Sequence, residues 1–363
     1  MKSTHKILIC DARRMEAIEN DSVELVVTSP PYPMIEMWDD LFSELNPTIG
    51  DELERKNGTQ AFNLMHRELD KVWMECYRVL KPGCLACINI GDAVRTINGS
   101  FRMYSNHANI IKSMCDIGFS QLPDILWRKQ TNAPNKFMGS GMLPSCAYVT
   151  YEHEYILIFR KGENRRFVSK TEKECRRKSA FYWEERNVWF SDVWMDLKGT
   201  SQVLCDKSAR ERSAAYPFEL PYRIICMNTI YGDTILDPFI GTGTTTAAAI
   251  SSCRNSIGID ISSGLKKTIQ DSALSSIKIG RRKIFDRLQQ HKEFMRVRSD
   301  SGKKIKYLNR NHNVPTVTAQ ETDIMMFAPK SINRISNSDF EVDYEFATAD
   351  IMPPTDQLSM FAS

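Results

Sequence analysis

Residues 233–249 read DTILDPFIGTGTTTAAA and carry the clearest signal of the fold. The apolar run 234–236 predicts a β-strand that ends at Asp237, and a loop with Gly241 and Gly243 follows it. Glycine allows the backbone to approach a ligand closely, and the small residues after the loop suit a helix that packs on a sheet. The stretch therefore predicts a strand, a glycine-rich loop and a helix, in that order.

The next apolar run, residues 256–259, ends at another acid, Asp260. A carboxylate about 20 residues after a glycine-rich loop is typical of the group that binds ribose hydroxyls. The dinucleotide spacing GxGxxG is not met, because Thr246 stands where the third glycine belongs. These residues indicate a ribose-bearing ligand and argue against a dinucleotide.

A second motif, Thr28-Ser29-Pro30-Pro31-Tyr32, directly follows the apolar run 23–27. Each proline fixes its own φ and restricts the residue before it, so the loop is stiff and the Pro30 carbonyl has a set direction. A planar amine bound there can donate hydrogen bonds to Ser29 and to that carbonyl while its ring stacks on Tyr32. The motif thus indicates chemistry on the amino group of a nucleobase, and a proline-rich turn without function is the alternative.

Five predicted strands share one form, an apolar run that ends in a polar residue. They are residues 6–10, 23–27, 85–90, 234–236 and 256–259. Near-continuous apolar runs suit strands that are covered on both faces, and open parallel sheets bind ligands outside the carboxyl ends of their strands. Helices are predicted over 59–80 and 105–116. The sequence therefore predicts an α/β protein with one ligand-lined sheet edge.

Bulk composition bounds the class of protein. The chain has 363 residues, 42% of them apolar, and a formal net charge of +3, which does not by itself indicate nucleic-acid binding. Its ten cysteines show no disulfide-framework spacing, and Cys84 and Cys87 would face opposite ways in a strand, which disfavours zinc. Scattered thiols, with neither a signal peptide nor a long apolar span, predict a cytoplasmic location and no membrane contact.

The pairing of TSPPY with DPFIGTGTT resembles the amino-group DNA methyltransferases that use S-adenosylmethionine. The order of the two motifs resembles the circularly permuted β group of that family. Matching stretches fall within residues 5–270 and include LKPGCLACINIGD, DILWRK, YEHEYILIFRKG and SAAYPFELPYRII. The resemblance implies a Rossmann-like α/β fold with a seven-stranded, mostly parallel sheet, one antiparallel strand and an inserted DNA target-recognition region.

The same resemblance implies a division of the chain into four parts. Residues 1–129 would form the catalytic half of the methyltransferase domain, and 213–275 its cofactor-binding half. Residues 130–212, which combine arginine and lysine clusters with tryptophans and Phe181, would recognise the DNA sequence, since basic side chains neutralise phosphates. Residues 276–363 would be a variable extension, basic over 278–310 and acidic after Thr318.

Roles for individual residues follow only from the resemblance. It implies that the target base is held by Ser29, Pro30, Pro31 and Tyr32. It places around S-adenosylmethionine the residues Asp237, Phe239, Gly241, Gly243, Thr244, Asp260, Asp11, Ser213 and Pro217. Asp260 would bind the ribose hydroxyls and Asp11 the adenine. No metal is needed for this chemistry.

The expected reaction is direct transfer of a methyl group to an exocyclic base amine. Because that amine is out of reach inside a duplex, the base should be flipped into the pocket. The carbon-5 cytosine reaction uses a cysteine, usually after a proline, and no cysteine here follows a proline. In the family, Ser-Pro-Pro-Tyr is associated with cytosine N4, and adenine N6 is the alternative.

The expected partners are double-stranded DNA and a cognate restriction endonuclease of a bacterial type II restriction–modification pair. Two other classes of protein would account for some of the same sequence features. A nicotinamide-dependent oxidoreductase would use the sheet and Asp260, but it leaves TSPPY unexplained. A non-catalytic DNA-binding regulator would retain the scaffold without the chemistry, although the intact Ser29, Tyr32 and Asp237 argue against such decay.

Overall fold

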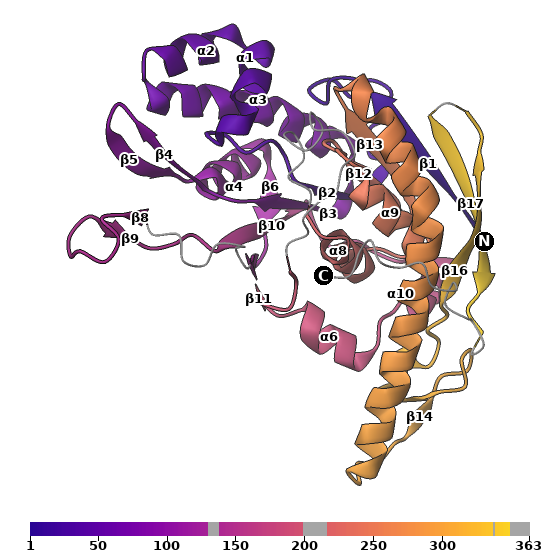
Figure 1. The fold of residues 1–363 in the computed structure, drawn as a ribbon. Coiled ribbons are helices and arrows are strands. Elements are labelled where there is room, and N and C mark those ends of the chain that lie inside the picture. Colours follow the sequence, from indigo (N-terminus) through magenta and orange to yellow (C-terminus); the bar gives the residue numbers. More distant parts are fainter. Residues whose placement is uncertain (130–137, 199–215, 337, 349–363) are drawn as a thin grey trace.

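The computed structural model describes residues 1–129, 138–198, 216–336 and 338–348 (Figure 1). Its main sheet has the strand order β11-β7-β10-β3-β2-β12-β13-β1-β17-β16, and β6 also pairs with β10. The strands of this sheet are β1 (Lys2–Ile9), β2 (Val23–Thr28), β3 (Leu80–Ile90), β6 (Phe119–Gln121), β7 (Ile125–Arg128), β10 (His153–Lys161), β11 (Val193–Trp194), β12 (Thr234–Asp237), β13 (Asn255–Asp260), β16 (Phe327–Arg334) and β17 (Asp339–Phe346).

The remaining elements cover the sheet or lie outside it. Three two-stranded sheets pair β4 (Ala93–Ile97) with β5 (Ser100–Tyr104), β8 (Met138–Gly139) with β9 (Ala147–Tyr148), and β14 (Tyr307–Leu308) with β15 (Pro315–Thr316). The helices are α1 (Asp39–Leu45), α2 (Pro47–Glu54), α3 (Gly58–Val79), α4 (Asn106–Ile117), α5 (Lys170–Lys178), α6 (Trp183–Trp189), α8 (Glu219–Asn228), α9 (Thr244–Ser251) and α10 (Lys266–Asp300).

The predicted seven-stranded core is confirmed and lies within a wider sheet. β3, β2, β12, β13 and β1 pair in parallel, and β10 pairs antiparallel with both β3 and β7. Beyond this core the sheet continues to 11 strands. The C-terminal hairpin β16–β17 pairs antiparallel with β1, so it covers a strand that would otherwise expose an unpaired edge.

Helices bury both faces of the sheet, as the near-continuous apolar strands predict. α3 and α4 pack on one face, and α8 and α9 contribute to the hydrophobic cluster on the other. Cys84 and Cys87 belong to these two different clusters, which confirms that they face opposite ways along β3.

The two predicted helices form nearly where the sequence indicates. α3 begins after Asn57, whose side chain accepts the Gln60 backbone N–H at 3.4 Å, and it ends at Val79, directly before β3. α4 ends at Gly118, which has a left-handed φ of 117° that glycine adopts without strain.

The basic and acidic halves of the C-terminal part contact each other. α10 runs beside β16 and β17 (Figure 1), and the Arg281 guanidinium pairs with Glu345 of β17 at an N–O distance of 2.5 Å. Arg287 of α10 is buried and pairs with Glu185 of α6. Several cations of this segment are therefore neutralised within the protein.

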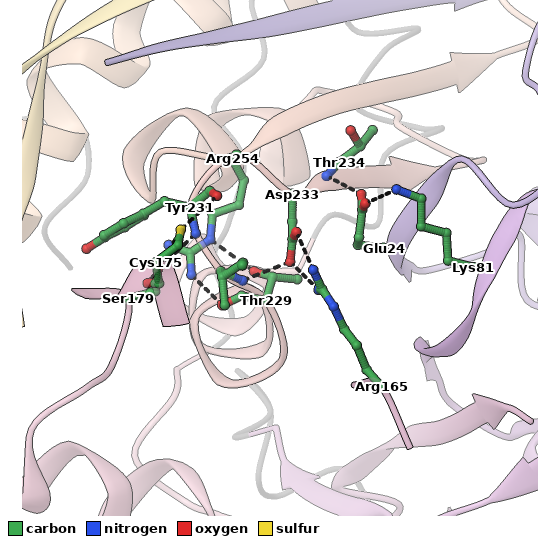
Figure 2. A network of polar contacts seen from close by, with 12 residues as sticks. Glu24, Lys81, Arg165, Cys175, Ser179, Thr229, Tyr231, Asp233, Thr234 and Arg254 are labelled. Atoms are coloured by element: carbon green, nitrogen blue, oxygen red, sulfur yellow. Dashed lines mark hydrogen bonds and ion pairs between the residues drawn. The ribbon is translucent and has the colours of Figure 1, made fainter. Parts of the chain in front are cut away.

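A polar network at the amino ends of the central strands fastens the segment after β10 (Figure 2). The Arg165 guanidinium pairs with Asp233 at 2.6 Å, directly before β12. Glu24 of β2 accepts the Thr234 amide at 2.8 Å and also pairs with Lys81 of β3. This network lies at the sheet edge opposite to the strand ends at Ser29, Asp237 and Asp260, so Arg165 has a structural role. None of the described helices is long and apolar enough to span a membrane.

Candidate active site

The proline loop and the glycine loop lie side by side because their strands are neighbours. β2 and β12 pair in parallel, with Val26 opposite Leu236, so the loops that follow them leave the same sheet edge. The Thr28 hydroxyl donates a hydrogen bond of 2.6 Å to Oδ1 of Asp237. Two motifs that are about 200 residues apart thus form one site, as open parallel sheets place their ligand sites.

A cavity of about 560 Å³ opens between these loops. It is lined by most of the residues that the sequence singled out, namely Ser29, Pro30, Pro31, Asp11, Asp237, Phe239, Gly241, Thr244 and Asp260. Gly243, Tyr32 and Pro217 do not line it. Ser213 lies outside the described residues.

Asp237 is the most deeply buried acid of the cavity, with 3% of its surface exposed. Its Oδ1 accepts the Thr28 hydroxyl and the Phe239 amide, and its Oδ2 accepts the hydroxyls of Thr245 and Tyr216. Burial nevertheless raises the pKa of Asp237 to about 6, because the charged form loses its hydration. Asp237 therefore joins β2, the glycine loop and the start of α9 through its hydrogen bonds.

Asp260 ends β13 and holds the glycine loop. Its Oδ2 accepts the Gly241 amide at 3.1 Å, and its Oδ1 accepts the Ser262 amide at 2.8 Å. Burial raises the pKa of Asp260 above its ordinary value. Since each oxygen keeps a second lone pair, the carboxylate can still accept hydroxyl groups from a ligand in the cavity.

Asp11 sits just beyond β1 on the same edge. Burial raises its pKa, but hydrogen bonds from the Arg13 side chain and amide outweigh that effect and keep the pKa below its ordinary value. The Arg13 guanidinium also pairs with the buried Glu68 of α3. Asp11 is thus an ionised acceptor that Arg13 holds in place.

Local sequence explains the shape of the glycine loop. Gly241 and Gly243 have φ values of 51° and 87°, and Gly243 is the residue before α9. Gly258 of β13 is needed for another reason, because a Cβ there would lie 2.0 Å from the Ile240 side chain. Gly243 therefore shapes the start of the helix without reaching the cavity wall.

Tyr32 lies behind the cavity wall. Its hydroxyl donates to Oε2 of Glu154 at 2.9 Å and accepts hydrogen bonds from Ser29 at 3.1 Å and Asn89 at 2.9 Å. Burial and the Glu154 charge raise the pKa of Tyr32 well above its ordinary value, so its hydroxyl stays protonated. Stacking of a base on Tyr32 remains a prediction, and the described aromatic rings on the wall belong to Trp38, Phe42, Phe239 and Tyr216.

Several residues of the cavity wall are not indicated by the sequence motifs. α1 and the turn before it contribute Trp38, Leu41 and Leu45, and α3 contributes Leu69 and Val72. Trp38, which follows the TSPPY motif closely in the sequence, lies on this wall. Tyr216 takes the position expected of its neighbour Pro217, which is buried beside the cavity. The only sequence signal for Tyr216 was its place in the SAAYPFELPYRII stretch.

The aromatic residues between 181 and 194 mostly form core. Tyr182, Trp189 and Trp194 are buried, whereas Trp183 and Phe190 are 38% and 45% exposed. Arg177 pairs with Asp323, as Arg165 pairs with Asp233. The buried aromatic rings and these two ion pairs therefore support the segment, whereas Arg166, Lys173 and Lys178 are exposed. Residues 130–137 and 199–212 of the same predicted region lie outside the described part of the chain.

One cluster among the described residues has metal-ligating groups, namely Glu184, His291 and Glu321. None of the three lines the cavity. Nδ1 of His291 lies 2.7 Å from Glu184, and its Nε2 lies 2.9 Å from the Pro315 carbonyl. Both ring nitrogens are thus engaged, and the cluster joins α6, α10 and the segment that follows them.

The chemistry of the cavity walls fits S-adenosylmethionine. The cavity offers carboxylates at Asp11, Asp237 and Asp260 and an apolar surface at Phe239, which suit a ligand with both polar and apolar parts. A Cβ on Gly241 would meet no atom closer than 3.9 Å, so the loop backbone stands open to the cavity. The fold and this cavity define an S-adenosylmethionine-dependent methyltransferase.

Comparison with known proteins gives the family. Residues 23–271 match the model of the N6/N4 DNA methylases. The chain is 49% identical over 346 residues to the type II methyltransferase M.MthZI of Methanothermobacter thermautotrophicus, covering 95% of this chain and 96% of that one. It is 52% identical over 280 residues to M.MjaI of Methanocaldococcus jannaschii, covering 74% and 91%.

A solved structure of a DNA methylase is also similar to this chain. The putative DNA modification methylase TTHA0409 of Thermus thermophilus, complexed with S-adenosyl-L-methionine, is 28% identical with a TM-score of 0.59, covering 75% of this chain and 94% of that one. The chain belongs to the N6/N4 DNA methylase family and is a type II DNA methyltransferase that uses S-adenosylmethionine. This membership excludes the nicotinamide-dependent oxidoreductase.

Proposed function

We propose that this enzyme methylates the exocyclic N4 amine of cytosine at a specific site in duplex DNA. The observation that supports it most is the common cavity of Ser29, Pro30 and Asp237. A base amine held at Ser29 and Pro30 would face the part of the cavity in which Asp237 and Asp260 hold the cofactor. The chemistry then needs no covalent intermediate and no metal.

The residues of the proline loop would activate the amine by holding its two protons. The amine lone pair is delocalised into the base ring, which makes it a poor nucleophile. Hydrogen bonds from its two N–H groups to Ser29 Oγ and the Pro30 carbonyl would favour a tetrahedral nitrogen whose lone pair points into the cavity. S-adenosylmethionine, when bound, supplies the electrophilic methyl group. Most of the rate enhancement would come from positioning and from dipoles fixed in advance.

Cytosine is favoured because the motif offers a neutral hydroxyl at Ser29, the form that the family associates with N4 methylation. Adenine N6 is the second candidate within the same family. The test is to methylate duplex DNA with the purified enzyme, digest it to nucleosides and separate them by mass. N4-methyldeoxycytidine is expected, and N6-methyldeoxyadenosine would show that the base assignment is wrong.

Base flipping should deliver the target base to this cavity, because the amine cannot be reached within the duplex. We propose that residues 130–212 recognise the DNA sequence, because the arginine and lysine side chains of this region can neutralise phosphates. Replacing the target base with a fluorescent analogue gives the test. Its emission should rise on binding as the base leaves the stack, and unchanged emission would contradict flipping.

We further infer that the enzyme protects host DNA in the cytoplasm from a restriction endonuclease with the same recognition site. The relatives M.MthZI and M.MjaI are both named type II methyltransferases, and this class name supports a protective role. Expression in a non-modifying host, followed by sequencing for modified bases, would reveal the protected sequence. Scattered modification without a common sequence would contradict a protective role.

A further inference from the structure

A chain of hydroxyl groups leads from the cavity wall into the protein. Ser29 Oγ, on the wall, lies 3.1 Å from the Tyr32 hydroxyl, which lies 2.9 Å from Oε2 of Glu154. Glu154 is in the antiparallel strand β10 and is 8% exposed. Asn89 Nδ2 of β3 donates both to the Tyr32 hydroxyl at 2.9 Å and to Glu154 at 2.7 Å.

The direction of these hydrogen bonds is determined by the groups at the inner end. A carboxylate only accepts, so the single hydroxyl proton of Tyr32 must point to Glu154. The Tyr32 oxygen then accepts from Ser29, and the Ser29 proton is therefore directed away from the cavity. The lone pairs of Ser29 Oγ are left facing the cavity, where they can accept a proton from a bound amine.

Glu154 is also paired with a lysine that reaches solvent. Its Oε1 accepts from Lys129 Nζ at 2.8 Å, and the Lys129 side chain is 44% exposed. The other titratable neighbours at the start of β10 are engaged elsewhere, since Glu152 pairs with Arg128 at 3.3 Å and His153 lies on the opposite face beside Tyr155. Lys129, Tyr32 and Asn89 are thus the groups that face Glu154 from the other packed elements.

We propose that Glu154 is a positioning residue that acts through Tyr32 and Ser29 and takes up the proton that the methylated amine releases. This inference rests on the proposed function. When the N–C bond to the methyl group has formed, the nitrogen carries a positive charge and one proton too many. That N–H bond breaks as the proton passes to Ser29 Oγ, the Ser29 proton passes to Tyr32, and the Tyr32 proton forms an O–H bond on Glu154. Glu154 then returns a proton to water beside Lys129.

The relay explains how a serine can act where the reaction requires a proton acceptor. A serine hydroxyl is too weakly basic to keep a proton at neutral pH, so a hydroxyl site needs an acceptor behind it. At the inner end of the path Glu154 and Asn89 are buried, and Ser29 and Tyr32 are partly buried. Neither the motif nor its spacing reveals Glu154, because it lies 122 residues from Tyr32 in the sequence.

The test compares Glu154→Gln, Tyr32→Phe and the double variant in single-turnover methyl transfer to duplex DNA. Glu154→Gln keeps the size of the side chain, and Tyr32→Phe keeps the ring, and each breaks the path. Each single change should lower the transfer rate by about 100-fold, in the range of general-base catalysis, while the affinities for S-adenosylmethionine and DNA change less than about two-fold. The double variant should be no slower than the singles, since both remove one path.

The pH profile separates this role from a structural one. The wild-type rate should fall on the acid side as a carboxyl group is protonated, and Glu154→Gln should lose that acid limb. Glu152→Gln, the same change two residues away and directly before β10, is the control and should keep both rate and profile. A Glu154→Gln rate like the wild type, an unchanged acid limb, or a parallel loss of DNA binding would overturn the relay.

The outcome is independent of which base is methylated. If the product is N6-methyldeoxyadenosine and the variants behave as stated, the base assignment fails and the relay stands. If the product is N4-methyldeoxycytidine and the variants are fully active, the function stands and the relay fails. If one variant does not fold, the other still decides the question.

Discussion

The Thr28 hydroxyl lies 2.6 Å from Oδ1 of Asp237, and this hydrogen bond joins the strand of the proline loop to the strand of the glycine loop. Thr28 is fully buried, and Asp237 is the most deeply buried acid that lines the cavity. The contact couples the place where the base is expected to bind to the place where the cofactor is expected to bind.

Replacing Thr28 with valine removes this hydrogen bond and keeps the side-chain shape. We expect a loss of stability of about 1.5–3 kcal/mol, as for hydrogen bonds to charged groups, and weaker binding of S-adenosylmethionine. Denaturant unfolding and calorimetric titration measure the two effects. Thr234→Val is the control, because the contact of Thr234 with Glu24 is through its backbone amide. Equal effects of both changes would contradict a special role of Thr28.

Replacing Ser29 with alanine should abolish methyl transfer without weakening cofactor binding. The change removes the acceptor for one amine proton and the first member of the hydroxyl chain. We expect a rate at least about 100-fold lower and an unchanged dissociation constant for S-adenosylmethionine. Transfer of a labelled methyl group to DNA gives the rate. Full activity of this variant would exclude the proposed role of the proline loop, and absence of transfer by the wild type would favour the DNA-binding regulator.

Replacing Asp260 with alanine should weaken cofactor binding. The variant loses an acceptor for the ribose hydroxyls and also frees the Gly241 amide that shapes the loop. We expect a dissociation constant for S-adenosylmethionine that is roughly 10–100-fold higher, which corresponds to the loss of one or two hydrogen bonds to a charged group. The exposed Asp271 of α10 offers a matched control, and Asp271→Ala should bind normally. Binding as tight as in the wild type would place the cofactor elsewhere.

The stability of the cofactor-free protein should depend on pH through Asp237. Its pKa is about 6 in the folded protein and near 3.8 in the unfolded chain, so between these values the folded protein binds the extra proton. Stability therefore rises as pH falls from about 7 to about 4, by on the order of 2–3 kcal/mol from this group. The difference in unfolding free energy between wild type and Asp237→Asn isolates the effect. A difference that does not vary with pH, or that varies in the opposite direction, would contradict the raised pKa.

Much of the fold could be predicted because the signals are local. Apolar runs that end in Asp11, Ser29, Asp237 and Asp260 place the strands of the parallel core to within a few residues. The glycine loop and the prolines specify backbone shape within a few positions. Most of the site residues that these motifs predict lie on the cavity wall, although they form only a part of that wall.

The remainder depends on contacts between distant parts of the chain, which no local pattern encodes. β17 pairs with β1, and β16 with β17, at the end of the sheet, and the acidic composition of this tail alone does not reveal the pairing. The place of Tyr32 behind the wall follows from its hydrogen bond to Glu154 on another strand. The recruitment of Trp38 and Tyr216 to the cavity is likewise decided by packing.

A crystal structure of the enzyme with S-adenosylhomocysteine and duplex DNA would test the central claim most directly. The distance to measure runs from the cofactor sulfur to the exocyclic nitrogen of the flipped base. We expect the sulfur to lie near Asp237, the ribose at Asp260, and the base amine within hydrogen-bonding distance of Ser29 Oγ and the Pro30 carbonyl, so that a methyl group fits between the sulfur and the nitrogen. A cofactor bound outside the cavity, or a base held away from Ser29, would contradict the account.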